Sequence, residues 1–205
     1  MARYGRQSRN PSAKAPAGRF RIIGGEWRGR RLPVPPEPGV RPTPDRVRET
    51  LFNWLAPLIT GARCLDLYAG SGALGLEALS RGAGQVVFVD RAPAALRQVA
   101  ANLATLKSDR GETVCMDALR YLERPATPFD VVFLDPPYGQ GLLEPVAERL
   151  FAGSWLSPGA AVYLEHEAEA LPPALPSGWQ LYRSAAAGRV RYHLARPAPA
   201  IAEDA

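Results

Sequence analysis

The chain has 205 residues, of which 46% are hydrophobic, and this is enough for the core of one ordinary domain. No apolar run approaches the ~18 residues that a membrane span needs, and the first residues lack the apolar segment of a secretory signal. The formal net charge is +5, and the only two cysteines, Cys64 and Cys115, lie in apolar runs, which excludes a disulfide scaffold and favours a cytoplasmic protein.

The positive charge is concentrated near the N-terminus. Residues 1–48 hold 12 Lys and Arg against three Asp and Glu, whereas acidic residues outnumber basic ones in the remainder. A basic arm on a mildly acidic body indicates a polyanionic partner, and a merely solubilising tail is the alternative. Residues 1–18 contain almost nothing to bury, so we expect a disordered basic tail.

Residues 19–39 predict a β-hairpin followed by a stiff, proline-rich linker. The expected strands cover residues 19–23 and 26–32, with a turn at Gly24-Gly25 or within residues 27–29. Arginines interleaved with an aromatic residue suit phosphate contacts and base stacking, and an edge hairpin with protective charges is the alternative. The predicted RNA-binding residues are Arg19, Arg21, Trp27, Arg28, Arg30 and Arg31.

A helix is predicted to follow this linker. Thr43 is its expected N-cap, Pro44 its first residue, and Asp45 suits the positive end of the helix dipole. We expect the buried stripe of the helix to be Val47, Leu51, Leu55 and Leu58. Three basic side chains lie close to its start, and we expect some of them to face a ligand or a phosphate: Arg41, Arg46 and Arg48.

From residue 63 the pattern alternates between strands and helices. Strands are expected at residues 63–67, 86–89, 113–116, 131–134 and 160–165, and helices at 73–81, 93–106, 118–123 and 142–151. Residues 179–183 and 190–194 predict a closing antiparallel pair. The alternation indicates an α/β, Rossmann-like domain over residues 40–195, with a mostly parallel sheet and helices on both faces. We expect a frayed tail over residues 196–205.

Four successive predicted strands end at or next to an aspartate, namely Asp66, Asp90, Asp117 and Asp135. Ligands of doubly wound sheets bind at the carboxyl ends of the strands. This regularity therefore predicts a crevice lined by carboxylates at one edge of the sheet.

The glycine-rich loop after the first of these strands predicts the cofactor site. Its G-x-G-x-x-G spacing also fits NAD, but Asp66 would repel a pyrophosphate and can instead bind an ammonium group. Asp90 can accept both ribose hydroxyls, and Asp117 the adenine amine. These groups together favour S-adenosylmethionine, with the predicted contacts Asp66, Tyr68, Ala69, Gly70, Ser71, Gly72, Asp90, Arg91, Asp117 and Ala118.

The strand end Asp135-Pro136-Pro137-Tyr138 predicts the catalytic site. Two prolines without N–H groups end the strand stiffly, leaving the Asp135 carboxylate and the Pro136 carbonyl as acceptors. Tyr138 adds a ring on which a base can stack. Two acceptors beside a stacking face suit a planar base that carries an exocyclic amine.

Over residues 21–194 the chain resembles the bacterial 16S rRNA guanine-N2 methyltransferases of the RsmD type. The most particular blocks are Arg-Ile-Ile-Gly-Gly-Glu-Trp-Arg-Gly-Arg at 21–30 and Arg-Pro-Thr-Pro-Asp-Arg-Val-Arg-Glu-Thr-Leu-Phe-Asn-Trp-Leu at 41–55. The glycine loop, Asp-Pro-Pro-Tyr and Val-Tyr-Leu-Glu at 162–165 are shared more widely. The resemblance implies a class I methyltransferase fold with seven strands, methylation of one guanine of small-subunit rRNA, and Arg41 and Thr43 near the methionine end of the cofactor.

Three alternatives stay open at this point. An adenine-N6 methyltransferase shares Asp-Pro-Pro-Tyr but needs a separate target-recognition region, an NAD-dependent oxidoreductase shares the glycine loop, and an assembly factor can bind RNA without catalysis. The expected partner is 16S rRNA or the small ribosomal subunit, and the protein is expected to be a monomer. We expect no metal at Glu165-His166-Glu167, because adjacent strand residues point to opposite faces.

Overall fold

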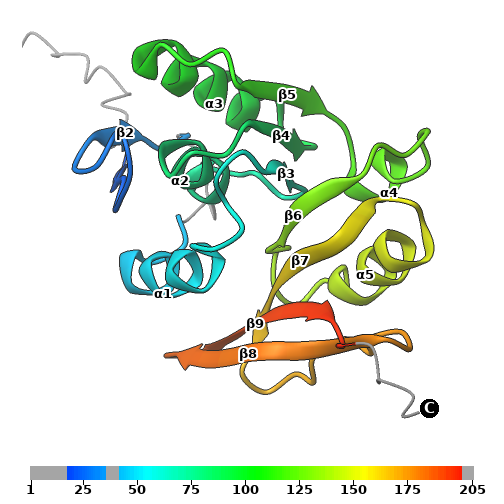
Figure 1. Cartoon of the computed structure of the whole chain (residues 1–205). Helices are drawn as coiled ribbons and strands as arrows, with labels where there is room; N and C mark the ends of the chain where they lie inside the picture. Colours follow the sequence, from blue (N-terminus) through cyan, green and yellow to red (C-terminus); the bar gives the residue numbers. More distant parts are fainter. Residues whose placement is uncertain (1–17, 36–41, 200–205) are drawn as a thin grey trace, which may run out of the picture.

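The fold is described from a computed structural model, in which residues 18–35 and 42–199 are placed (Figure 1). The predictions for the basic tail up to residue 17, for Arg41 and the end of the linker, and for residues 200–205 lie outside the described residues. Within the described ranges, no helix is both long and apolar enough to cross a membrane.

The core is a seven-stranded sheet with the strand order β5-β4-β3-β6-β7-β9-β8. Neighbouring strands run parallel from β5 to β7, and β9 pairs antiparallel with both β7 and β8. This arrangement confirms the Rossmann-like α/β prediction. The strands are β3 (Arg63–Asp66), β4 (Gln85–Asp90), β5 (Gly111–Cys115), β6 (Phe129–Leu134), β7 (Leu156–Glu167), β8 (Trp179–Ala187) and β9 (Val190–Pro197).

The closing pair is longer than predicted. Trp179 of β8 still pairs with Pro197 of β9, so the sheet continues past the predicted domain boundary at residue 195. The alanines at 185–187, which lie between the two predicted strands, belong to β8. The turn itself falls at Gly188, whose φ is +58°, a conformation that glycine adopts without strain.

Helices cover both faces of the sheet (Figure 1). One face packs against α1 (Asp45–Leu55), α2 (Ala73–Ser80) and α3 (Pro93–Leu106), and the other against α4 (Ala118–Tyr121) and α5 (Leu143–Ala152). Alternate strand residues supply the two cores: Cys64 and Phe88 face the first group, and Leu65 and Val87 face the second. The sheet is therefore buried on both faces, as its continuous apolar strands predict.

The N-terminal extension forms a separate two-stranded antiparallel ribbon of β1 (Arg19–Arg21) and β2 (Arg31–Pro33). The predicted hairpin exists, but residues 22–30 form a long connection that packs on the end of α2. The N–H of Glu26 donates to the Ser80 carbonyl over 2.7 Å, and that of Trp27 to the Ser80 hydroxyl over 2.9 Å. A Cβ at Gly25 would lie 1.8 Å from the Ser80 carbonyl oxygen, so the close approach requires glycine there.

This docking corrects one predicted RNA contact. The Trp27 side chain is only 6% exposed, because the connection folds inward and buries the ring in the core. The expectation that the ribbon presents Trp27 to a base is therefore wrong. The ring instead lies 5.5 Å from the Arg110 guanidinium carbon, in a cation–π contact.

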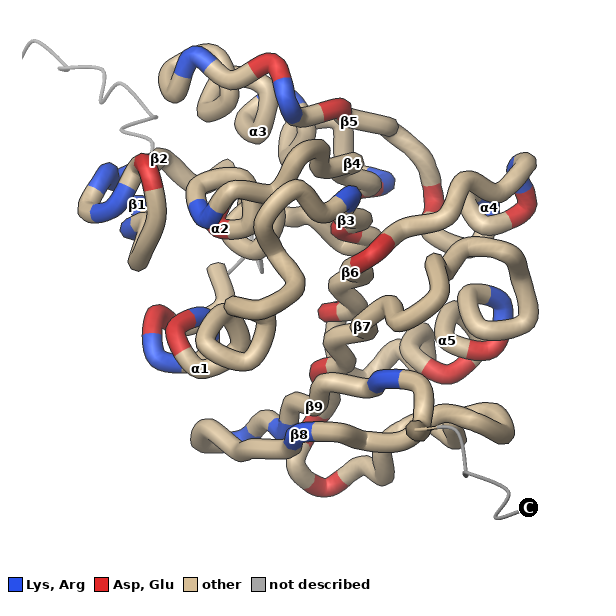
Figure 2. Tube along the Cα trace, in the orientation of Figure 1, with Lys and Arg blue, Asp and Glu red and all other residues tan. Residues whose placement is uncertain are grey.

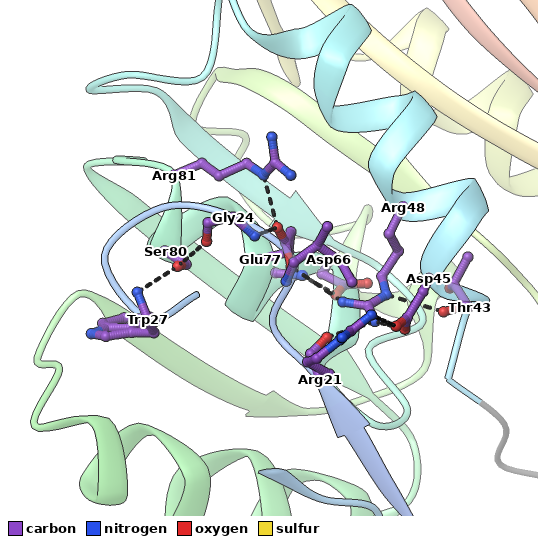
Figure 3. Close-up of polar contacts among 12 residues, drawn as sticks. Arg21, Gly24, Trp27, Thr43, Asp45, Arg48, Asp66, Glu77, Ser80 and Arg81 are labelled. Carbon is purple, nitrogen blue, oxygen red and sulfur yellow. Dashed lines mark hydrogen bonds and ion pairs between the residues drawn. The ribbon is translucent and has the colours of Figure 1, made fainter. Parts of the chain in front are cut away.

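A buried ion cluster fastens the extension to the domain (Figure 3). The Glu77 carboxylate on α2 is fully buried and accepts hydrogen bonds from the N–H groups of Ile23 and Gly24, both over 2.8 Å. It also pairs with Arg48 of α1 over 3.2 Å and with Arg81 over 2.7 Å. One carboxylate thus joins the extension, α1 and the helix that follows the glycine loop.

Arg48 of α1 is the basic residue at the centre of the same ion cluster. It is 0% exposed and donates to the carbonyls of Thr43 and Arg21 and to the Asp45 carboxylate, so it faces the protein interior rather than a ligand. Of the other two arginines expected near a ligand, Arg46 is exposed. Burial lowers the pKa of the Arg48 guanidinium, and the charges of Glu77 and Asp45 oppose that shift.

Candidate active site

The carboxyl ends of β3, β4 and β6 meet at one edge of the sheet, as the strand order requires. Asp66 and Asp90 are the last residues of β3 and β4, and Asp135 follows the last residue of β6. Asp117 lies two residues beyond β5 and caps α4. The four aspartates predicted from the strand ends are therefore brought to the same edge.

Asp66 lies under the glycine loop in the protein interior and binds the backbone of the helix that follows the loop. This side chain is 2% exposed, and its carboxylate accepts the Gly75 N–H over 3.1 Å. Gly72 caps α2 with a φ of +75°, which lets the chain turn sharply into the helix. Burial raises the pKa of Asp66 to about 7, and the negative charge of Asp90 acts in the same direction.

Asp90 joins the glycine loop to the segment that follows β4. One carboxylate oxygen accepts the Gly70 N–H and the other the Ala92 N–H, each over 2.8 Å. A carboxylate oxygen has more than one acceptor direction, so Asp90 can also accept hydroxyl groups of a ligand. Asp117 is exposed, and one of its oxygens accepts the N–H groups of Leu119 and Arg120.

The other predicted cofactor residues differ in exposure. Ala69, Ser71, Gly72 and Ala118 are buried, Tyr68 and Gly70 are half-buried, and Arg91 is exposed. Burial raises the pKa of the Tyr68 phenol to about 12, so it stays a hydrogen-bond donor at neutral pH. The arrangement offers acceptors, backbone N–H groups and one phenol to a polar ligand.

Thr43 links the start of α1 to the end of β6. Its side chain is 8% exposed and its hydroxyl donates to Asp135 over 3.3 Å. The prediction that Thr43 caps α1 is wrong, because Pro44 takes the N-cap position and no side chain caps the helix. The hydroxyl is engaged instead with a carboxylate 92 residues further along the chain.

Asp135 is half-buried among other acids. Burial of its carboxyl group raises its pKa well above the ordinary value, and the charges of Glu165 and Asp66 raise it further, against the Thr43 hydrogen bond. Pro136 is buried and Pro137 exposed. Within the described part of the chain, the Pro136 carbonyl accepts no hydrogen bond, which leaves it available to a ligand.

Glu165 is a site residue that the sequence reasoning missed. It is 3% exposed and accepts hydrogen bonds from the hydroxyls of Tyr138 and Tyr163, one at each carboxylate oxygen. Leu134 pairs with Leu164 in the parallel ladder, so Glu165 lies beside Asp135. Tyr138 is thus held at its hydroxyl while the side chain stays 42% exposed.

The hairpin presents its five predicted arginines on the surface, all of them exposed: Arg19, Arg21, Arg28, Arg30 and Arg31. Figure 2 shows this basic ribbon apart from the acidic strand ends of the sheet. Arg21 pairs with Asp45 over 3.1 Å, which places the ribbon against the start of α1. The segment that leads into α1 carries Thr43, so the ribbon borders the candidate active site.

The two histidines form a hydrogen-bonded pair on β7 and β9. Their Nε2 atoms lie 3.0 Å apart, and the Ser184 hydroxyl lies 2.7 Å from the His193 Nδ1. Burial lowers the pKa of His193, and the neighbouring His166 acts in the same direction. No group of three or more metal-ligating side chains occurs among residues 18–35 and 42–199.

Comparison with known proteins gives independent evidence for the family of this chain. The family model described as "Conserved hypothetical protein 95" matches residues 20–196. The chain is 51% identical over 178 residues to Ribosomal RNA small subunit methyltransferase D of Escherichia coli strain K12, covering 87% of this chain and 90% of that protein. The protein of the same name from Haemophilus influenzae is 46% identical over 188 residues, which is 90% of this chain and 95% of that one. A solved structure titled as a putative methyltransferase from Escherichia coli aligns with a TM-score of 0.82 and 48% identity, over 88% of this chain and 98% of that one.

Proposed function

This chain belongs to the Conserved hypothetical protein 95 family, that of ribosomal RNA small subunit methyltransferase D, and from this membership we propose its reaction. The family makes it an rRNA methyltransferase. We propose that it transfers a methyl group from S-adenosylmethionine to the exocyclic N2 amine of one guanine in small-subunit rRNA.

The cofactor proposal rests on the acceptor groups at the carboxyl ends of β3, β4 and β5, which suit S-adenosylmethionine. Asp90 would accept the ribose hydroxyls, Asp117 the adenine amine, and Asp66 would lie near the amino-acid end. Gly70 and Gly72 have positive φ values, which let the glycine loop turn tightly where the ligand would bind. The bound cofactor supplies an electrophilic methyl group on a positively charged sulfur. Thr43 and Arg41 are proposed to border its methionine end.

A single observation carries the choice of an exocyclic amine. Just after β6, three neighbouring residues combine an Asp135 carboxylate, a Pro136 carbonyl that accepts no hydrogen bond within the described part of the chain, and a Tyr138 side chain that is 42% exposed. Two acceptors can hold the two N–H bonds of an NH₂ group, while a ring stacks on the base. This geometry matches an amine on a flat base better than it matches a ring carbon or a hydroxyl.

Asp135 and Pro136 would then act by positioning the amine for attack. An exocyclic amine is a poor nucleophile because its lone pair is delocalised into the ring. If Asp135 and Pro136 each hold one N–H, the nitrogen becomes pyramidal and its lone pair points along the line of attack. The N–C bond forms as the S–C bond breaks, and the proton lost from nitrogen passes to Asp135 or through it to water. The raised pKa of Asp135 favours its acceptance of that proton.

The test is the identity of the product. Small ribosomal subunits from cells lacking this gene would be incubated with the protein and S-adenosylmethionine carrying a labelled methyl group, and the labelled nucleosides identified by mass spectrometry. We expect N2-methylguanosine at one position. Label in N6-methyladenosine would replace this proposal with the adenine alternative, and the absence of label would favour a non-catalytic factor.

A further inference from the structure

A cavity of about 480 Å³ lies between the hairpin and the start of α1. Its hairpin side is lined by Arg19 and Arg21 of β1 and Arg31 of β2, and its helix side by residues 42–45. The other two arginines of the ribbon, Arg28 and Arg30, do not line it. Three of the five exposed hairpin arginines therefore line the cavity, and two do not.

The cavity adjoins the proposed active site through one residue. Thr43 lines the cavity, and its hydroxyl donates to Asp135 over 3.3 Å. A group bound in the cavity would thus lie next to a base held at Asp135. In an RNA strand, the group next to a base is the backbone phosphate of its own or the adjacent nucleotide.

The charge of the cavity suits an anion. Among the described residues that line it, the one acid is Asp45, which is already paired with Arg21 over 3.1 Å and with the buried Arg48 over 2.6 Å (Figure 3). Arg19 and Arg31 line the cavity as positive charges beyond that pairing. Arginine forks bind phosphate oxygens in a bidentate manner.

The register of the hairpin adds an independent argument. Arg21 lies directly opposite Arg31 in the antiparallel pair. Like charges directly opposite one another destabilise a two-stranded ribbon. Asp45 offsets the charge of Arg21, and an anion bound beside Arg31 would offset the other charge of this pair.

We propose that this cavity binds the RNA backbone phosphate that flanks the target guanine. The inference rests on the proposed function, because it takes the guanine at Asp135 as its reference point. It assigns different roles to the arginines of one ribbon: Arg19, Arg21 and Arg31 fix the position of the strand at the active site, and Arg28 and Arg30 do not. Such a contact sets which nucleotide enters, since phosphate contacts fix register.

The test compares three double variants that each remove two positive charges. Arg19→Gln with Arg31→Gln empties the cavity of free charge, Arg28→Gln with Arg30→Gln changes the ribbon outside it, and Arg97→Gln with Lys107→Gln changes the exposed surface near α3. Binding to small subunits lacking the modification would be measured against KCl concentration, together with the KM and kcat of methyl transfer and the affinity for S-adenosylhomocysteine.

We expect the cavity variant to raise the KM for subunits about tenfold or more, with kcat at saturation and S-adenosylhomocysteine affinity within about twofold. Its slope of log affinity against log salt should fall by about 0.7 for each phosphate of a single strand that the variant no longer neutralises. The α3 variant should change each quantity less than twofold. Equal losses of affinity in both ribbon variants would overturn the cavity assignment, as would weaker S-adenosylhomocysteine binding by the cavity variant. An inactive wild type would contradict the proposed function instead, while the salt slopes would still decide the cavity.

Discussion

At the scale of single residues, the site depends on a side chain that never needs to touch the substrate. Glu165 accepts the hydroxyls of Tyr138 and Tyr163, so the exposed ring of Tyr138 is held at its tip. A stacking ring that is already oriented loses little conformational freedom when a base binds. Stacking of a base on an aromatic side chain contributes about 1–3 kcal/mol, so the orientation of this ring matters to the proposed reaction.

The first prediction concerns this tether. In Glu165→Gln one of the two tyrosine hydroxyls loses its acceptor, because an amide offers one oxygen where a carboxylate offers two. We expect kcat to fall about tenfold or more, with S-adenosylhomocysteine affinity preserved. Tyr138→Phe keeps the ring but loses the same hydrogen bond, and the double variant should be no worse than Glu165→Gln alone. Full activity in Tyr138→Phe would show that the tether is dispensable.

The second prediction concerns Asp66 and pH. Its pKa is raised to about 7 in the folded protein, so the fold binds a proton that the unfolded chain releases near pH 4. The free energy of unfolding should therefore fall as pH rises from about 4 to about 7 through this group. Asp66→Asn removes the charge. Its free energy of unfolding relative to that of the wild type should therefore increase, by up to a few kcal/mol, as pH rises across that range.

Urea unfolding at pH 5 and pH 8 checks this prediction, with Asp109→Asn on the exposed surface as the control. The same Asp66 variant should bind S-adenosylhomocysteine more weakly, because it lacks the charge proposed to face the amino group. A stability difference that does not depend on pH would contradict the assignment.

The residue scale also shows what the sequence could predict. The four aspartates were identified because each follows a strand, and a strand end is visible in a single sequence. Glu165 was not, because its place beside Asp135 depends on the register of β6 with β7. The alternation Val-Tyr-Leu-Glu did place Tyr163 and Glu165 on one face, but only the pairing shows that this face meets Tyr138.

At the scale of elements, the molecule joins three segments through one buried carboxylate. Glu77 lies on α2, which begins at the glycine loop, and it bonds to the extension and to Arg48 of α1. Arg48 in turn holds the carbonyl of Thr43, whose hydroxyl contacts Asp135. The ribbon, the glycine loop and the end of β6 are thereby held in one arrangement.

The third prediction tests this junction. Glu77→Ala leaves the buried charge of Arg48 and the partly exposed charge of Arg81 without their common partner, and removing one member of a buried pair costs about 3–5 kcal/mol. We expect a loss of that order in the free energy of unfolding, measured by urea denaturation. Glu49→Ala on the exposed side of α1 should change it by less than about 0.5 kcal/mol. A Glu77→Ala protein as stable as the wild type would contradict the role of the cluster.

The bounds of a helix or strand were predicted well where they depend on the local sequence pattern. They were predicted less well where they depend on contacts with distant residues. The apolar repeat of α3 gave its bounds, because the stripe ends where the helix ends. The start of α1 and the hairpin connection were misjudged for one physical reason. Thr43, Ile23 and Trp27 satisfy polar groups with partners more than 50 residues away, which no local pattern reveals.

At the scale of the whole molecule, the ribbon and the strand ends differ in charge. The ribbon carries exposed arginines, and acidic residues lie at the strand ends of the sheet (Figure 2). A basic rim attracts the RNA backbone over a distance that salt screens, while the carboxylates inside suit an amine and a positively charged sulfur. This division explains how a domain with acidic strand ends can serve a polyanionic substrate.

The central claim is that the end of β6 holds the amine that is methylated. The most direct test is the rate of N2-methylguanosine formation on small subunits by Asp135→Ala, beside the control Asp109→Ala. We expect Asp135→Ala to lose methyl transfer almost completely while it keeps S-adenosylhomocysteine affinity, and Asp109→Ala to match the wild type. Undiminished methyl transfer by Asp135→Ala would contradict the account.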